Sequence, residues 1–380
     1  MNRPAHLVPD RGDARIAEIA GRLDRLLRNQ VPDERFVRSL RSTVQEWSQA
    51  IWSTAESLGA SIPPPAEFER GLKLSQRPVF VCGLARSGTT LLRDLLDGHP
   101  ELVAIPNESG FYINMQRALF DLRSDRQCSY VGRRWIEKLA ARPPFWLLGS
   151  SDEAPYVAFA RDYAGWWQVP ERCKDARISS WPLAAFALAF AQRLGAGTLP
   201  HAARMWVEKT PGNERFVSRM WHDFPAAKVI QIVRRPEAVL ASLKRMTPRQ
   251  LGRRRTTAHV IREMAPGYRI AAASIDRLPK DRYCLIRYED LTADPDAVML
   301  RIARFLGIEP LPSLLLPTAA GRPAANNSSF GTSRPALDDI LDPVDRALLA
   351  LATGRHAAKL GYGRNQPSSA AGHAIVGSRA

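Results

Sequence analysis

The sequence predicts an α/β fold, a mostly parallel sheet flanked by helices, with a helical extension at its N-terminus. Short apolar runs of strand length recur along the chain, and each is followed by a segment whose apolar residues have helical spacing. This alternation is typical of parallel sheets that are covered by helices. The segment before these runs shows helical spacing alone, which predicts the extension.

Residues 1–75 are predicted to be a helical N-terminal extension and a connector. Apolar residues such as Ile16, Ile19, Trp47 and Ile51 recur at helical spacing, and the prolines at positions 63–65 then end any helix and form a stiff connector. The extension is interpreted either as a cap packed on the main domain or as a partner-binding segment. Its amphipathic pattern favours the cap.

The main domain is expected to span residues 76–365, and residues 366–380 to form a disordered tail. Its first unit is an apolar strand at 78–82, a loop, and a helix that ends at Gly98. A strand at 228–233 precedes a helix opened by Pro236, and a strand at 283–286 precedes a helix that Asp294 caps and Gly307 ends. Ligands of such folds bind beyond the carboxyl ends of the strands, where these loops lie.

The first loop, residues 83–90, matches the phosphate-binding pattern G-x-x-x-x-G-K-[ST] except that Thr89 replaces the lysine. The loop amides and the helix N-terminus still form an anion site, but no lysine reaches from a β- to a γ-phosphate. A nucleoside triphosphate therefore fits poorly. A single phosphate bearing a sulfuryl group fits better, because Arg86 and the hydroxyls of Ser87, Thr89 and Thr90 can satisfy its oxygens without a metal ion. The fold is thus expected to be of the P-loop type.

Two motifs resemble those of sulfotransferases that use 3′-phosphoadenosine 5′-phosphosulfate (PAPS), in the branch of the tyrosylprotein sulfotransferases and many bacterial enzymes. Arg86-Ser87-Gly88-Thr89-Thr90 is similar to the family's 5′-phosphosulfate loop. Residues 233–242 resemble its 3′-phosphate site, in which an arginine ends a strand and a serine follows eight positions later. The resemblance implies that Arg234 and Ser242 hold the 3′-phosphate, and Arg235 is expected to face solvent or substrate.

Two more segments extend the resemblance to about residues 78–310. Residues 206–211 are similar to the family's strand-end lysine motif, and residues 287–291 to the stretch before its last core helix. The resemblance implies that Lys209, together with Arg86, stabilises the charge of the sulfuryl group and leaving phosphate. The other interpretation of Lys209 is a surface lysine in an ion pair. Tyr288 is expected to pack against the adenine.

The resemblance also implies a catalytic glutamate in a loop after a His-Pro pair, which points to Glu108 as the general base. Its spacing from His99-Pro100 is one residue longer than in the tyrosylprotein enzymes. Glu101 and His99 remain competing bases. Glu101 suits a solvated turn, and His99 follows a helix end where histidine is more often structural.

Further candidates lie at the edge of the resemblance. Ser328 or Ser329, in a stretch rich in Gly, Pro, Asn and Ser, either closes over the nucleotide or belongs to a plain surface loop. Met246 stands where the tyrosylprotein enzymes carry an arginine, and Lys244 or Arg245 is a candidate substitute.

Composition limits the alternatives without choosing among them. The formal net charge of +16 predicts attraction to polyanions of many kinds. The predicted function is transfer of a sulfuryl group from PAPS to a hydroxyl acceptor by in-line displacement, with no metal and no nucleic-acid partner. The alternatives are a P-loop kinase or nucleotide hydrolase, which needs the missing lysine, and a basic nucleic-acid-binding protein, which leaves the loop unexplained.

The acceptor and the oligomeric state stay open at this point. A sugar, peptide, phenol or lipid hydroxyl is compatible with the sequence, and the tryptophans between residues 110 and 203 suit either stacking on an acceptor or core packing. No apolar run is long enough to span a bilayer, so a cytoplasmic location is expected. The four cysteines are widely spaced and are expected to be reduced.

Overall fold

The computed structural model describes residues 15–19, 21–22, 34–116, 119, 124–140, 154–168, 180–245, 256–324 and 340–363. Contacts divide the chain into two compact units. The first unit comprises Met1–Pro78, Pro100–Glu208 and Arg219–Ala226, and the second comprises Val79–His99, Lys209–Ser218 and Ala227–Ala380. The domain boundaries expected from the sequence stay predictions.

The strands form a five-stranded sheet in the order β2-β3-β1-β4-β5. They are β1 (Pro78–Cys82), β2 (Leu102–Ala104), β3 (Met205–Lys209), β4 (Lys228–Val233) and β5 (Tyr283–Arg287). The pairs β1–β4, β4–β5 and β2–β3 are parallel, with Cys82 opposite Gln231 and Val233 opposite Arg287. The predicted parallel sheet flanked by helices is confirmed. Because parallel strands end at the same edge, the loops after β1, β4 and β5 gather there.

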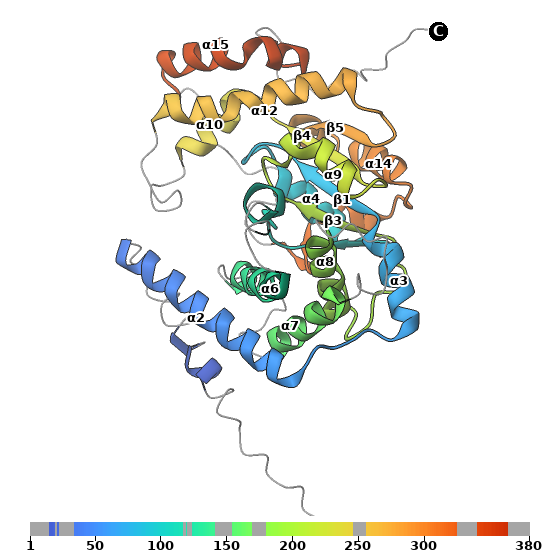
Figure 1. The fold of residues 1–380 in the computed structure, drawn as a ribbon. Coiled ribbons are helices and arrows are strands. Elements are labelled where there is room, and N and C mark those ends of the chain that lie inside the picture. The colour runs from blue at the N-terminus through green and yellow to red at the C-terminus, as the bar shows by residue number, and fades with distance from the viewer. Residues whose placement is uncertain are drawn as a thin grey trace, which may run out of the picture. The chain divides into compact units, whose positions relative to one another are not determined.

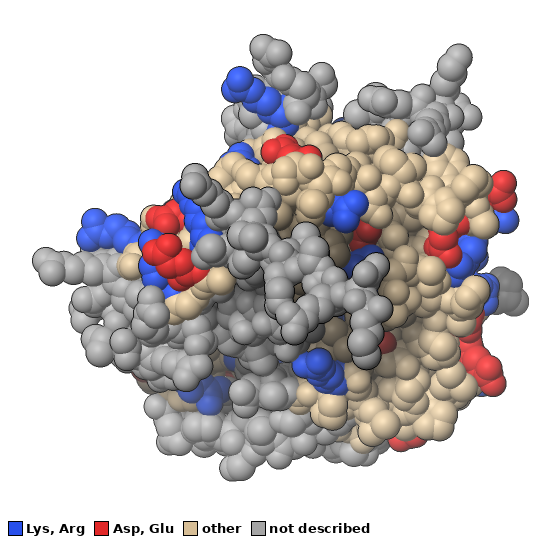
Figure 2. Space-filling model, turned by 90° about the horizontal axis from the view of Figure 1, so that it is seen from below, with Lys and Arg blue, Asp and Glu red and all other residues tan. Residues whose placement is uncertain are grey.

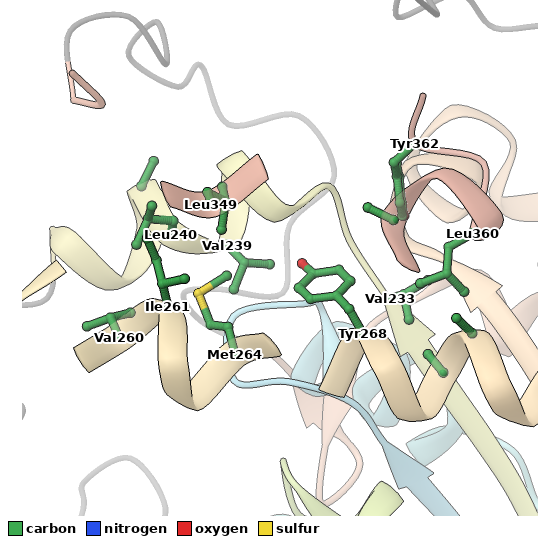
Figure 3. Close-up of a cluster of buried hydrophobic side chains, with 14 of the residues drawn as sticks. Val233, Val239, Leu240, Val260, Ile261, Met264, Tyr268, Leu349, Leu360 and Tyr362 are labelled. Carbon is green, nitrogen blue, oxygen red and sulfur yellow. The ribbon is translucent and has the colours of Figure 1, made fainter. Parts of the chain in front are cut away.

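In the second unit a helix follows each of the strands β1, β4 and β5. The helices are α4 (Thr89–Asp97), α10 (Pro236–Lys244), α12 (Thr257–Arg277), α13 (Tyr288–Ala293), α14 (Pro295–Leu306) and α15 (Pro343–Lys359), together with the 3-10 turns Asn213–Phe216 and Pro312–Leu315 and a small hairpin of Thr318–Ala319 and Arg322–Pro323. Helices α10, α12 and α15 pack against one another (Figure 1). Their buried side chains form one apolar cluster with the end of β4, including Val233, Leu240, Ile261, Tyr268, Leu349 and Tyr362 (Figure 3).

Capping residues explain where these helices begin and end. The Asp294 side chain accepts a hydrogen bond of 3.0 Å from the Ala297 amide, and Gly307 ends α14 with a φ of 73°. Both features confirm the prediction. Helix α15 begins with a capping box, in which the side chains of Asp342 and Asp345 each accept from the other's backbone amide. The sequence contains this cap, but the helix was not predicted.

The first unit contains the predicted helical extension. The helical elements of this unit are α2 (Glu34–Leu58), α3 (Pro65–Ser75), the π-helical turn Phe111–Met115, α6 (Ser124–Ala140), α7 (Ala154–Trp167) and α8 (Trp181–Leu194). Helix α9 (Val217–Asp223) begins in the second unit and ends in the first. Helix α2 packs against α6 and α7. No helix in the described ranges combines the length and apolar character needed to cross a membrane.

Three tryptophans of α6, α7 and α8 belong to the core of the first unit, and a fourth, Trp167 of α7, is half-buried. Trp135, Trp166 and Trp181 are buried, and the Trp135 ring stacks on Phe186 with ring centroids 4.2 Å apart. Of the two interpretations open for these tryptophans, core packing is therefore the one that their burial favours.

Candidate functional site

The loop between β1 and α4 requires glycine at two positions. Gly83 and Gly88 have φ angles of 141° and 101°, which L side chains rarely adopt. A Cβ at Gly83 would lie 2.3 Å from the Ile232 carbonyl oxygen, and one at Gly88 would lie 2.3 Å from Cδ2 of Tyr288. The loop thus runs directly against β4 and the Tyr288 ring. Arg86 also has a positive φ, 70°, so the loop holds a strained residue at its exposed tip.

Hydrogen bonds within the loop fix its shape. The Ser87 amide and hydroxyl both donate to the Leu84 carbonyl oxygen, at 3.1 and 2.6 Å. Helix α4 starts immediately afterwards, with the Leu92 amide donating to the Gly88 carbonyl at 3.0 Å. Thr89 and Thr90 are the first two residues of this helix, so their amides lie among those that make no intrahelical bond. Such a loop followed by a helix N-terminus is a suitable binding site for a phosphate or sulfate group.

The structure brings the two predicted phosphate sites together. Arg86, from the loop, donates from Nε to Oγ of Ser242 in α10 at 2.9 Å. Arg234, at the end of β4, donates from Nη1 to the Arg86 carbonyl oxygen at 3.0 Å. Arg234 and Ser242 are 8% and 9% exposed, so both are largely buried. Two separate motifs of the sequence predicted these three residues. In the structure they form one hydrogen-bonded group within the second unit.

Tyr288 belongs to the same group. The Arg234 guanidinium lies over its ring, 4.4 Å from the centroid, and Gly88 lies against the ring edge. Burial raises the pKa of the Tyr288 hydroxyl, and the negative charge of Glu289 raises it further. The ring thus contacts a residue of each predicted phosphate site, while its contact with an adenine stays a prediction. Arg235 is half-buried, with its guanidinium 5.9 Å from the Tyr362 ring centroid.

Lys209 ends β3 as predicted, but its side chain is 4% exposed. The interpretation as a surface lysine is therefore wrong. Two hydrogen bonds connect the turn that follows Lys209 to Gly83, at the start of the phosphate loop. The Gly212 amide donates to the Gly83 carbonyl at 3.0 Å, and the Gly83 amide donates to Oε2 of Glu214 at 3.2 Å.

Glu214 was not predicted from the sequence, because no motif marks it. It is 2% exposed, and its Oε1 atom has no hydrogen-bond partner among the residues that the structure describes. Burial raises the pKa of this carboxyl group, against the smaller lowering effect of the backbone amides that it accepts from. The buried carboxyl group of Glu214 therefore contacts Gly83, the first residue of the phosphate loop.

The three candidate bases have different surroundings. Glu108 lies in the first unit and is exposed, and its carbonyl oxygen accepts from Nζ of Lys138 at 3.0 Å. Glu101, also in the first unit, forms an ion pair with Arg204. His99, in the second unit, is 2% exposed, and its Nε2 lies 2.9 Å from the Glu309 carbonyl oxygen. The surroundings of His99 agree with its structural interpretation.

Several predicted residues lie outside the described ranges, namely Ser328, Ser329 and Met246. Of the two candidate substitutes for an arginine at position 246, Lys244 forms an ion pair with Asp345 of α15, and Arg245 is exposed, with Nε 3.4 Å from the Ala241 carbonyl oxygen. In the part of the chain that the structure describes, no group of His, Cys, Asp and Glu side chains could hold a metal ion. Cys82, Cys128 and Cys284 are free thiols.

Charge on the molecular surface is mixed where it can be followed. On the described surface that Figure 2 shows, basic and acidic side chains lie interspersed. Arg86 and Arg234 bring two guanidinium groups to the loops after β1 and β4, and this pair of charges suits a ligand with phosphate groups.

Comparison with known proteins decides the family. A model of the sulfotransferase family matches residues 78–312, well over half of the chain. The chain belongs to the sulfotransferase family. The match covers the phosphate loop, Lys209, Arg234, Ser242 and Tyr288, and it ends before α15. No curated protein matches this sulfotransferase.

Solved structures of bacterial sulfotransferases are similar to this sulfotransferase at low sequence identity. The sulfotransferase domain of the Synechococcus PCC 7002 olefin synthase is 21% identical, with 77% of this chain and 96% of that chain covered and a TM-score of 0.39. The sulfotransferase domain from the curacin biosynthetic pathway is also 21% identical, with coverages of 75% and 97% and a TM-score of 0.42. Sulfotransferase STF1 from Mycobacterium tuberculosis is 15% identical, with coverages of 90% and 93% and a TM-score of 0.43. The family assignment rests on the family model.

Proposed function

We propose that this sulfotransferase uses PAPS as its donor and transfers the sulfuryl group to a hydroxyl group of a sugar, peptide, phenol or lipid. One observation carries the proposal: Arg86, Ser242 and Arg234 form one hydrogen-bonded group that joins the phosphate loop to the end of β4. PAPS carries phosphate at both its 5′ and 3′ positions, and this group offers donors to both.

The donors of the group remain available to a ligand. Ser242 Oγ accepts from Arg86, so its own hydroxyl hydrogen can point to a phosphate oxygen. Arg234 uses Nη1 on a carbonyl, and the rest of its guanidinium fork suits bidentate contact with a phosphate. The amides at the start of α4 add donors for the 5′-phosphosulfate. These residues fit PAPS without a metal ion.

In the proposed reaction the acceptor oxygen forms a bond to sulfur while the bond from sulfur to the bridging phosphate oxygen breaks. The acceptor proton passes to the carboxylate of Glu108, and 3′-phosphoadenosine 5′-phosphate (PAP) leaves with the negative charge. Arg86 and Lys209 stabilise that charge as it develops. The role of Glu108 is proposed from the sequence resemblance alone.

Calorimetric titration with PAP in the presence of a metal chelator tests the donor site. The wild-type protein is expected to bind PAP with a low-micromolar dissociation constant or tighter, and adenosine 5′-phosphate much more weakly, since it lacks the 3′-phosphate. Arg234→Ala should abolish this preference, and Arg304→Ala, at an exposed arginine of α14 in the same unit, serves as the control. Absence of PAP binding at millimolar concentration would reject the proposal.

A screen with radiolabelled PAPS identifies the acceptor. Sugars, peptides, phenols and lipids with free hydroxyl groups are offered to the wild-type protein and to Glu108→Gln. Label transferred by the wild type alone identifies both the class of acceptor and a dependence on the proposed base. A gel shift with DNA and RNA, run over a range of salt concentrations, tests the nucleic-acid-binding alternative.

A further inference from the structure

The peptide unit between Arg234 and Arg235 is held by hydrogen bonds from two side chains, the buried Tyr268 and the half-buried Glu289. Its carbonyl oxygen, on Arg234, accepts from the Tyr268 hydroxyl at 2.7 Å. Its amide, on Arg235, donates to Oε1 of Glu289 at 2.9 Å. Rotation of this peptide would break both bonds, so the direction in which the Arg234 side chain leaves the backbone is fixed.

Glu289 is itself oriented by the C-terminal part of the chain. Its second oxygen, Oε2, accepts from the Tyr362 hydroxyl at 2.7 Å. Tyr362 is 7% exposed, and two guanidinium groups contact its ring, that of Arg287 at 4.7 Å and that of Arg235 at 5.9 Å from the centroid. Burial and the neighbouring Glu289 raise the pKa of Tyr362 well above its ordinary value, so its hydroxyl remains a donor at physiological pH.

Helix α15 places Tyr362. The residues just after the helix, Leu360 and Tyr362, are buried in the same apolar cluster as Val233 and Tyr268 (Figure 3). The ion pair of Lys244 with Asp345 also connects α15 to α10, the helix that carries Ser242. The matched family segment ends at residue 312, so α15 and Tyr362 lie beyond it.

We propose that Tyr362 and Glu289 are positioning residues for the 3′-phosphate site, acting through the Arg234–Arg235 peptide. This inference rests on the proposed function, since it concerns the affinity for a 3′-phosphorylated nucleotide. A chain of contacts carries it, from Tyr362 to Glu289, from Glu289 to the Arg235 amide, and from the same peptide to Arg234 over Tyr288. The C-terminal segment is thereby part of the donor site, although neither residue touches the nucleotide.

The test compares two ligands on conservative variants of the full chain. Tyr362→Phe keeps the ring that Arg287 and Arg235 contact and removes only the hydroxyl. PAP binding is expected to weaken about tenfold, the order of effect of one lost hydrogen bond to a charged group. Binding of adenosine 5′-phosphate should change little, because this nucleotide has no 3′-phosphate for Arg234 to contact. Tyr268→Phe removes the bond on the other side of the peptide and should show the same selective loss.

Tyr283→Phe is the matched control. Tyr283 is a buried tyrosine of the same unit, and its hydroxyl donates to Oε1 of Gln231 at 2.7 Å. This variant should lower the thermal midpoint while leaving both dissociation constants unchanged. An equal change for the two ligands in Tyr362→Phe, or no change in either, would overturn the positioning role. A wild-type protein that fails to bind PAP would instead reject the proposed function.

Discussion

The Arg86 guanidinium donates from Nε to Oγ of Ser242 at 2.9 Å, across residues that are 156 positions apart in the chain. Arg86 is exposed and has a positive φ, so this bond is a main restraint on its side chain. Ser242→Ala is therefore expected to loosen Arg86 and to remove one donor from the 3′-phosphate site. PAP affinity should fall about tenfold, measured by calorimetry.

The control for Ser242→Ala is Thr353→Ala. Thr353 is also a buried hydroxyl residue on a helix of the second unit, and it donates to the Leu349 carbonyl at 2.8 Å. Its loss should affect stability alone. Wild-type PAP affinity in Ser242→Ala would remove this serine from the donor site.

Gly88→Ala tests the close approach of the loop to Tyr288. The left-handed conformation at φ 101° costs an L residue about 1–2 kcal/mol, and the added Cβ would also meet the Tyr288 ring at 2.3 Å. We expect both a lower free energy of unfolding and a large loss of PAP affinity. Gly307→Ala, at φ 73° with no atom within 4 Å, should show the conformational cost without the loss of affinity.

Glu108→Gln tests the proposed base. The amide cannot take the acceptor proton, so turnover with PAPS should fall by roughly 10²–10⁴. PAP affinity should stay at the wild-type value, because the residues proposed to hold PAP are unchanged and the amide has nearly the shape of the carboxylate. Glu101→Gln serves as the control and should retain most of the activity. Near-normal turnover in Glu108→Gln would exclude this residue as the base.

Lys209→Met tests the charge at the end of β3. The bridging oxygen gains its negative charge in the transition state, so the variant should lose turnover far more than it loses PAP affinity. Lys228→Met is the control, because Lys228 begins β4 and its Nζ atom donates to the Phe305 carbonyl. Equal losses of turnover and affinity in Lys209→Met would indicate that Lys209 binds the nucleotide equally well in the ground state and the transition state.

Glu214 predicts a pH dependence of stability. Burial raises its pKa in the folded protein above the ordinary value of 4.5, so the folded state holds this proton more tightly than the unfolded state does. The free energy of unfolding should therefore fall as the pH rises from 4.5 through the raised pKa. Glu214→Gln keeps an acceptor for the Gly83 amide but cannot ionise.

The thermal midpoint of Glu214→Gln relative to the wild type should accordingly increase with pH over this range. The exposed Glu69 offers a control for the change in charge, Glu69→Gln. A difference between Glu214→Gln and the wild type that does not depend on pH would show that the pKa of Glu214 is the same in the folded and unfolded states, which would contradict the prediction.

Local signals explain which parts could be predicted from the sequence. The strand before the phosphate loop, the cap at Asp294 and the stop at Gly307 are determined by residues close in the chain, and all three predictions are confirmed. The strand that ends at Lys209 followed from its motif and is likewise confirmed.

Long-range contacts explain what was missed. Tyr362 acts on Glu289 across 73 positions, and Glu214 on Gly83 across 131, and neither contact has a local pattern. Strand β2, Leu102–Ala104, is too short to give a periodic signal. The burial of Lys209 was also not apparent, because a strand-end lysine has the same sequence pattern whether it faces solvent or the protein interior.

The two hydrogen bonds to the Arg234–Arg235 peptide affect the free energy of ligand binding. Ordering a long, flexible arginine at a binding site costs conformational entropy, about 0.5–1.5 kcal/mol for each side chain that a ligand has to immobilise. Here the Tyr268 and Glu289 contacts fix the backbone of Arg234, and the Tyr288 ring supports its guanidinium, when the protein folds. That entropic cost is therefore met on folding, and the nucleotide proposed to bind there would meet an arginine whose orientation is already fixed.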